Sequence, residues 1–341
     1  MKKRFDFVIS NPPYNEETEN TSDKPVYNYF MDAAKKISDK AAFITPARFL
    51  FDAGKTPKDF NQRMLNDPHL KVLDYAPDAR KYFKGVDIKG GVAITLRDET
   101  ENFGAIGTFI PFEELKSIHK KIYSSNKDFR SINEIIFTTG IFHFTEAFSI
   151  NNPATAKILK SNSVDFLTTN IFEKLPKNFL NAVPNDGYEY VQIYGLLNMH
   201  RVYKWIRRDY ITEHETLDKF KVFLPKSNGS GEFGEVLSNP VIGEPNQGCT
   251  QTFITVGAFD TRDEAEACLK YIKSKFARCM LGILKVTQHN PPSTWAKVPL
   301  QDFTSASDID WSLDVDAQLY RKYNLSETEI KFIETRVKAM S

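Results

Sequence analysis

The stretch Phe5-Asp6-Phe7-Val8-Ile9-Ser10-Asn11-Pro12-Pro13-Tyr14 decides the fold. A short apolar run with β-branched residues stops at a polar residue, two prolines and an aromatic, which predicts a buried strand that empties into a rigid loop. Continuous apolar strands belong to parallel sheets covered on both faces, and ligands bind beyond the carboxyl ends of such strands. We therefore expect the residues from Asn11 to Tyr14 to lie at a functional site.

The residue types of this loop fit one reaction. The exocyclic amino group of a base is a poor nucleophile because its lone pair is delocalised into the ring. Two acceptors that bind its N–H groups would free the lone pair, and the Asn11 side-chain oxygen and the Pro12 carbonyl are such acceptors. Pro12 and Pro13 have a fixed φ and no N–H, so they hold both acceptors in place. Tyr14 offers a flat face to a base turned out of the helix.

Asn11-Pro12-Pro13-Tyr14 after an apolar strand resembles motif IV of the amino-group DNA methyltransferases. These enzymes methylate adenine at N6 with S-adenosylmethionine, so the resemblance implies that cofactor and that substrate. Further matches are the helix 25–34, the strand and exit loop 43–50, the run 86–95, and the tail segments 308–322 and 325–337. By position, Tyr27 or Phe30 would be the family's aromatic residue near the adenine of the cofactor.

The later matches resemble the Type IIG restriction-modification methylases, which join or pair a methylase with a target recognition domain. In that family a glycine-rich cofactor loop precedes the catalytic strand, but here only residues 1–4 precede it. Segments 229–231 and 254–260 contain glycine but do not show the expected pattern. The resemblance therefore implies that a partner subunit or a missing segment carries the main cofactor-binding half. The chain alone would then bind S-adenosylmethionine weakly or not at all.

The order of the predicted elements divides the chain into three parts. Strands and helices alternate in 1–105, which predicts an α/β, partial doubly wound (Rossmann-like) sheet. The mixed α+β pattern of 106–305 resembles a target recognition domain, and 306–341 form a helical tail with a Ser326–Glu329 capping box. The expected strands are 5–10, 41–45, 70–75, 91–96, 189–193, 221–224 and 253–256, and the expected helices are 25–36, 58–65, 262–284 and 325–337.

The catalytic strand of this family lies beside the first cofactor-binding strand, which the chain lacks. A bare strand edge offers unpaired backbone groups to other chains, and natural proteins avoid it. We therefore expect the edge of strand 5–10 to be covered by a partner subunit, by a second copy, or by another segment of this chain.

Two stretches of the middle part are candidates for contacts to double-stranded DNA. In 201–208, cations alternate with aromatics, which suits phosphate contacts and stacking, although a cationic face over core aromatics has the same pattern. The polar loop 226–231 follows a predicted strand and either reaches base edges or is a plain surface loop. The candidate residues are Arg201, Lys204, Trp205, Arg207 and Arg208, and then Lys226, Ser227 and Asn228. A third, weaker candidate is 285–290.

Composition limits the class of protein. The net charge is only +1, so DNA binding must come from local patches. No apolar run approaches ~20 residues, and 1–4 lead directly into a strand, so we expect neither a membrane span nor a signal peptide, and a cytoplasmic location. Cys249, Cys268 and Cys279 are scattered without metal-ligand spacing, so no metal site is expected.

Two other functions are compatible with the sequence. A non-catalytic specificity subunit would bind DNA and lend its acceptor loop to a partner. An endonuclease is the other, because Pro77-Asp78 and Asp87-Ile88-Lys89 match the short signature of metal-dependent restriction nucleases. A second loop, Asn290-Pro291-Pro292-Ser293, resembles the first one, but it follows a helical pattern and Ser293 cannot stack on a base.

Overall fold

The computed structural model describes residues 3–16, 24–125, 128–161 and 165–340. The strands are β1 (Phe5–Ser10), β2 (Asn15–Glu16), β3 (Lys24–Pro25), β4 (Ser38–Pro46), β5 (Leu70–Ala76), β6 (Val92–Asp98), β7 (Ile136–Phe137), β8 (Tyr190–Leu197), β9 (His200–Arg207), β10 (Phe220–Pro225), β11 (Val241–Gly243), β12 (Gln247–Cys249) and β13 (Phe253–Phe259). The α-helices are α1 (Tyr27–Ile37), α2 (Lys58–Leu65), α3 (Glu113–Ser125), α4 (Glu146–Asn151), α5 (Pro153–Ser161), α6 (Ile171–Lys174), α7 (Arg262–Lys273), α8 (Lys275–Leu281), α9 (Val315–Lys322) and α10 (Glu327–Arg336).

The fold is mixed α/β, as expected, and the chain divides into two compact units that we describe separately. Unit 1 contains residues 1–120, 230–233 and 282–288, and unit 2 contains 121–229, 234–281 and 289–341.

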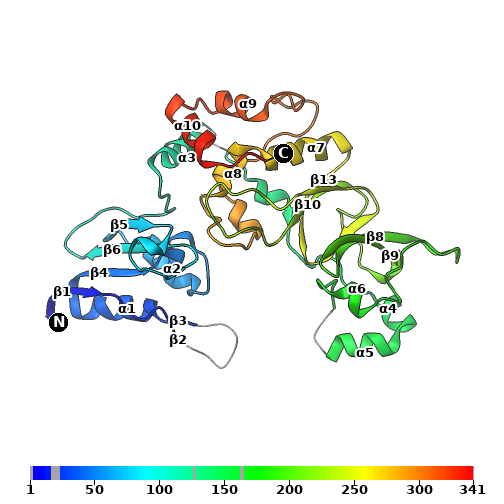
Figure 1. Ribbon diagram of the computed structural model, residues 1–341, viewed down its shortest axis with the longest axis horizontal. Helices are drawn as coiled ribbons and strands as arrows, with labels where there is room; N and C mark the ends of the chain where they lie inside the picture. Colours follow the sequence, from blue (N-terminus) through cyan, green and yellow to red (C-terminus); the bar gives the residue numbers. More distant parts are fainter. Residues whose placement is uncertain (1–2, 17–23, 126–127, 162–164, 341) are drawn as a thin grey trace. The chain divides into compact units, whose positions relative to one another are not determined.

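Unit 1 is built on a sheet which, in the described residues, has four strands in the order β1-β4-β6-β5 (Figure 1). β1 is parallel to β4, and β6 is antiparallel to both β4 and β5. The elements predicted for this part of the chain are confirmed. Strand 5–10 and helix 58–65 match β1 and α2 residue for residue, and the other predicted elements match within a few residues.

One face of this sheet is covered by α1 and α2. Apolar residues of α1 recur with helical spacing, so one stripe of the helix faces the sheet. The core that results includes Tyr27, Met31 and Ala34 of α1, Phe60 and Met64 of α2, and Ala41, Phe43, Leu70 and Ala93 of the sheet. Val8 is the residue of β1 that packs against this core.

The prediction that β1 is a buried strand is wrong for the described chain. Phe5, Phe7 and Ile9 are 56%, 43% and 81% exposed. These three side chains point to the face opposite Val8, since successive strand residues alternate between the faces. β1 is also the outer strand of the sheet, and among the described residues β4 is its one partner in that sheet.

A glycine turn ties the ends of the central strands together. Gly91 has a φ of 77°, and a Cβ atom there would lie 2.3 Å from the carbonyl oxygen of Ala76 and 2.8 Å from Cα of Pro77. The Gly91 carbonyl accepts a hydrogen bond of 2.9 Å from the Ala47 amide, just beyond β4. Gly91 therefore lets the start of β6, the end of β5 and the exit of β4 approach each other.

Gly91→Ala is expected to destabilise unit 1 by roughly 3 kcal/mol or more, because left-handed strain adds to a clash with rigid backbone. Gly85→Ala is the matched control: Gly85 has the same φ of 77° but no atom within 4 Å of the added Cβ. Its expected cost is about 1–2 kcal/mol. Urea unfolding of the two variants measures the difference, and equal costs would contradict this account of the turn.

Unit 2 contains two sheets in its described residues, with orders β11-β10-β13-β7 and β12-β8-β9. The predicted strands 189–193, 221–224 and 253–256 are confirmed within β8, β10 and β13. The tail contains α9 and α10, and the predicted Ser326–Glu329 capping box is present.

The single helix predicted over 262–284 is wrong. The structure has α7 and α8, separated by Ser274 with an extended ψ of 150°. The Ser274 amide donates to the carbonyl oxygens of Lys270 and Tyr271 at the end of α7, and its hydroxyl accepts from the Ala277 amide in α8. A serine that caps both helices explains the break, since serine is a preferred N-cap residue.

The β8–β9 hairpin has a strained turn. Its loop is Asn198-Met199, with φ of 49° and 65°, between the paired residues Leu197 and His200. Two-residue turns of this kind favour glycine or asparagine, and a left-handed conformation costs a residue such as methionine about 1–3 kcal/mol.

A buried cation links several loops of unit 2. Lys221, fully buried on β10, donates from Nζ to the carbonyl oxygens of Leu217 (3.0 Å), Lys219 (2.8 Å) and Glu244 (2.8 Å). Burial lowers the pKa of Lys221 to about 7, whereas its ordinary value is 10.5. The ammonium therefore satisfies three carbonyls at the cost of desolvation.

Lys221→Met is expected to lower the free energy of unfolding by about 2–4 kcal/mol near neutral pH, because the carbonyls lose their donor. Between about pH 7 and pH 10.5 the unfolded wild-type chain binds more protons at this lysine than the folded one. The contribution of Lys221 to stability therefore rises with pH across that window. The variant should show a flatter dependence of Tm on pH than wild type or the exposed control Lys219→Met, and parallel curves would refute this.

Candidate active site

The loop 11–14 follows β1 at the carboxyl end of the β1–β4 pair. Ser10 pairs with Phe43, so the parallel register sets the loop beside the last residues of β4. Asn11 and Pro13 are exposed, and Pro12 is buried. The Tyr14 carbonyl accepts a hydrogen bond of 3.1 Å from the amide of Val26, the residue that precedes α1. The loop is therefore fixed at both ends, while Asn11 is open to solvent.

Both predicted acceptors are unused within the described part of the chain. Neither the Asn11 side-chain oxygen nor the Pro12 carbonyl takes part in a hydrogen bond there. The two oxygens are therefore available to a donor with two N–H groups, such as an exocyclic amine.

Tyr14 is half-buried and packs against Phe83. The two rings are edge-to-face, with centroids 6.3 Å apart and an interplanar angle of 77°. The Tyr14 hydroxyl is buried without a hydrogen-bond partner in the described residues, and desolvation raises the pKa of this phenol. Sequence reasoning missed Phe83, because none of the segments that resemble the family includes it and a ring contact across the fold leaves no local pattern.

The two aromatics predicted near the cofactor have different environments. Tyr27 is 2% exposed, its ring packs among Phe49 and Phe60, and its hydroxyl is hydrogen-bonded to that of Thr56 at 2.7 Å. Phe30 is 44% exposed. Of the two, Phe30 has a face that an adenine can reach without opening the core.

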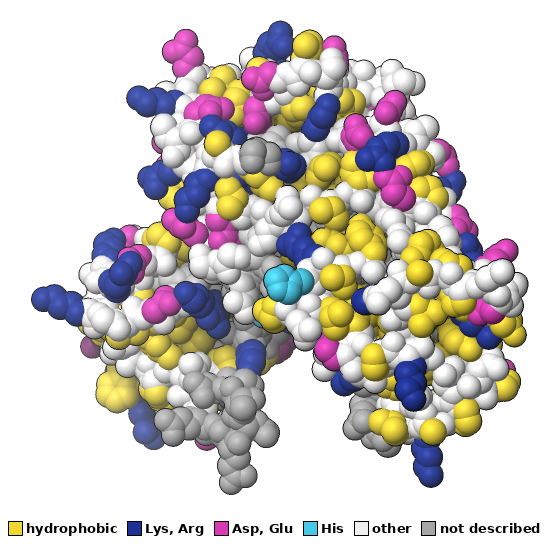
Figure 2. All heavy atoms as spheres, turned by 45° about the vertical axis from the view of Figure 1, so that its right-hand side comes forward, with side chains coloured by type: hydrophobic (Ala, Val, Ile, Leu, Met, Phe, Trp, Pro, Cys, Tyr) yellow, Lys and Arg dark blue, Asp and Glu magenta, His cyan; other side chains and the backbone are white. Residues whose placement is uncertain are grey.

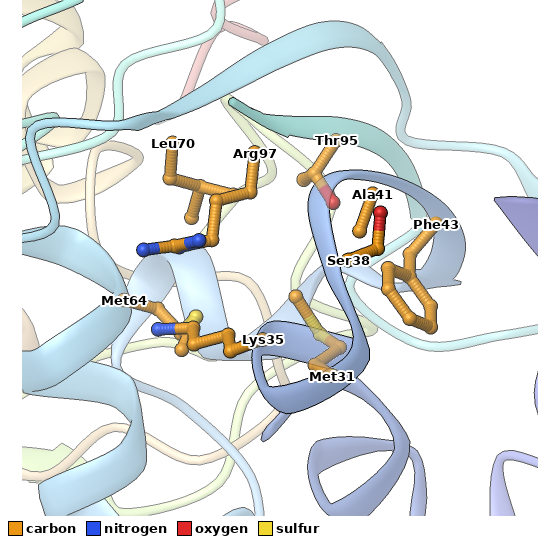
Figure 3. A pocket seen from close by; sticks show the side chains of 9 residues that line it. All are labelled: Met31, Lys35, Ser38, Ala41, Phe43, Met64, Leu70, Thr95 and Arg97. Carbon is orange, nitrogen blue, oxygen red and sulfur yellow. The ribbon is translucent and has the colours of Figure 1, made fainter. Parts of the chain in front are cut away.

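A cavity lies on the helix-covered side of the sheet (Figure 3). Its lining includes Met31 and Lys35 of α1 and Arg97 of β6, and Figure 3 shows the nitrogen ends of Lys35 and Arg97 on the same side. Both cations pair with Asp67, at 3.1 Å and 3.0 Å. The cavity of about 10 Å³ has room for a single water molecule at most, so it is a packing gap and not a ligand site.

The predicted DNA-contacting cations on β9 and just beyond it divide into two groups. Arg207 pairs with Asp209 at 2.5 Å and lies over the ring of Tyr188. Arg208 is held by Glu213 at 2.7 Å and Asp218 at 2.6 Å. The positive charges at this end of the strand are therefore compensated within the chain.

Arg201, two residues beyond the turn residue Met199, donates to the carbonyl oxygens of Asn239 (2.7 Å) and Ser238 (3.0 Å). Lys204, in the middle of β9, donates to the side-chain oxygen of Asn181. These acceptors are neutral, so the charges of Arg201 and Lys204 remain available to phosphates. Trp205 is half-buried, and its backbone bonds in both directions to Leu180.

The second candidate stretch is more ordered than the sequence suggests. Asn228 is 3% exposed, and its amide group donates to the Val236 carbonyl at 2.9 Å, while its oxygen accepts from the Ser238 amide. Ser227 is exposed and Lys226 is half-buried. In this structure Lys226 and Ser227 are therefore the two residues of the set with solvent-facing side chains.

The surface carries charges of both signs. On the face in Figure 2, basic and acidic side chains are interspersed among hydrophobic ones. A hollow of about 520 Å³ in unit 2 is lined by Asp128, Asp260, Glu264 and Asp302, with Arg130 as its basic residue. Its negative charge does not suit a phosphate backbone.

The acidic residues of the nuclease signature form ion pairs with neighbouring basic residues. Asp78 pairs with Arg80 at 2.7 Å, and Asp87 pairs with Lys89 at 2.7 Å. Within the described residues, no cluster of histidine, cysteine and acidic side chains is suited to hold a metal ion.

Asn290 belongs both to the second proline loop, 290–293, and to the third candidate stretch for DNA contacts, 285–290. This residue is fully buried, and its side-chain oxygen accepts from the indole Nε1 of Trp295 at 2.8 Å. Asn290 is therefore a core residue that supports the loop before Trp295.

One comparison with known protein families gives a match in the first part of the chain. Residues 1–83 match the family model of the Eco57I restriction-modification methylases, which supports a methyltransferase role. A search of the curated proteins finds no match. No helix among the described residues is long and apolar enough to cross a bilayer.

Two solved structures are similar to the chain at 8% identity. One is the type IIG restriction endonuclease BpuSI, with a TM-score of 0.31 and coverage of 97% of this chain and 54% of that one. The other is the type IIL restriction-modification enzyme MmeI in complex with DNA, with a TM-score of 0.36 and coverage of 98% and 55%. The chain thus spans about half the length of these enzymes.

Proposed function

We propose that this chain is the catalytic and DNA-binding component of an N6-adenine DNA methyltransferase from a restriction-modification system. The observation that carries the proposal is the pair of unused oxygens, on Asn11 and Pro12, at the carboxyl end of a strand in a region that matches a methylase family. The parts 106–305 and 306–341 would then be the target recognition domain and a helical tail. The sheet order β1-β4-β6-β5, with β6 antiparallel, supports a partial Rossmann-like methyltransferase sheet.

The proposed mechanism needs no general base. The Asn11 side-chain oxygen and the Pro12 carbonyl accept the two N6 hydrogens of an adenine turned out of double-stranded DNA, which frees the lone pair of the nitrogen. Pro13 keeps the loop rigid, and Tyr14 stacks on the base while the edge contact with Phe83 holds its ring. S-adenosylmethionine, when bound, supplies a cationic methyl donor. The attacking amine becomes acidic after transfer and loses its proton to water.

Asn11→Ala is expected to reduce methyl transfer at least about 100-fold, since one of two preorganised acceptors is lost, and to leave DNA affinity largely intact. The measurement is the N6-methyladenine content of DNA from cells that express the full chain with its neighbouring genes. Asn15→Ala, an exposed asparagine just beyond the loop, is the matched control. Normal methylation by Asn11→Ala would remove this residue from the mechanism and favour a specificity subunit.

The exposed side of β1 supports the proposal that a partner subunit carries the main cofactor-binding half. Among the described residues β1 is the outer strand of its sheet, and such a strand can accept a further one. Phe5, Phe7 and Ile9 form an exposed apolar row on this strand. From this chain, Phe30 is the residue available to the adenine of S-adenosylmethionine. The remaining cofactor contacts would come from the partner.

Ile9→Asp is expected to abolish association with this partner and, with it, methylation, because a charge would enter an apolar contact. Ile9 is 81% exposed, so the substitution should leave the fold intact. Leu313→Asp, at a 64% exposed apolar residue of unit 2, is the control and should be neutral. Co-purification and S-adenosylmethionine titration test this. Tight cofactor binding and full activity of the isolated chain would exclude the partner.

A further inference from the structure

The turn of the β8–β9 hairpin presents a methionine that the fold does not use. Met199 is 86% exposed and has a φ of 65°, where a glycine would be free of strain. The neighbouring Asn198 amide donates to the carboxylate of Glu173 on α6 at 3.1 Å, which anchors the base of the turn. The turn is thus held in place while its apolar tip stays in water.

The charges around this tip differ from those at the other end of β9. Arg201 and Lys204 bond to neutral oxygens, and His200 is exposed beside Met199. Arg207 and Arg208, at the far end of the strand, are paired with carboxylates. Lys174 and Lys177 are exposed near Glu173 in the sequence and make no salt bridge in the described part of the chain. Arg201, close to the turn, and Lys204, in the middle of β9, are therefore the cations of the strand that have no carboxylate partner among the described residues.

We propose that Met199 is an apolar wedge that enters the base stack of duplex DNA, while Arg201 and Lys204 contact phosphates on either side. This inference rests on the proposed function, because it takes DNA as the substrate. Methionine suits the role, since its side chain is unbranched and polarizable and such apolar residues unstack base steps when inserted. Unstacking one step lowers the cost of turning the target adenine out of the helix. Insertion into the base stack would explain why the turn has a strained, exposed methionine where glycine would be free of strain.

The test begins with duplexes that the full chain selects from a random pool, because the recognised sequence is not needed in advance. 2-Aminopurine is then placed at each position of a selected duplex, and its fluorescence reports unstacking. Wild type should raise the fluorescence at one step beside the recognised bases. Met199→Gly should abolish this rise and weaken binding about tenfold. Met199→Leu, which keeps an apolar wedge, should retain most of both effects.

Two controls separate the wedge from folding. Met199→Gly should have an unchanged or higher Tm, because glycine adopts this turn without strain. Leu313→Gly, which removes another exposed apolar side chain of unit 2, should bind and unstack DNA like wild type.

The outcomes distinguish this inference from the proposed methylation. Equal fluorescence and affinity for Met199→Gly and wild type, or no enrichment of any duplex, would overturn the wedge. Loss of unstacking in Met199→Gly would support the wedge whatever the result for Asn11→Ala. Unchanged methylation by Asn11→Ala would contradict only the proposed role of Asn11 in methylation.

Discussion

The candidate active site depends on the parallel pairing of β1 with β4. Hydrogen bonds along one side of β1 set the point at which its last residue, Ser10, leaves the sheet beside Phe43. A slip of one residue would turn Val8 away from the core and bring Phe7 towards it. Asn11 would then leave the sheet on the other face. The two prolines can hold the acceptors only because this register has already placed them.

Several charged and polar side chains of unit 2 hold its own loops. Lys221 serves three backbone carbonyls, Asn228 holds the segment around Val236, and Arg208 holds two carboxylates.

Local patterns predicted the elements of the first hundred residues well, because strand 5–10 and helix 58–65 are defined by neighbours in the sequence. The exposure of β1 could not be predicted, since burial depends on which segments pack against a strand. The partners of Arg208 and Asn228 lie five to ten residues away, in loops without periodicity. The structural roles of Arg208 and Asn228 could therefore not be predicted from the sequence either. The different exposures of Tyr27 and Phe30 could not be predicted either, because they depend on how α1 packs against Phe49 and Phe60.

The exposed apolar residues of β1 limit the concentration of unpartnered chain that a cell can tolerate. An outer strand beside the exposed apolar row of Phe5, Phe7 and Ile9 is prone to pair with other extended chains, including further copies of itself. Chains made in excess over whatever covers this strand would engage chaperones or be degraded. Synthesis in matched amounts, from one transcript, would keep that excess small.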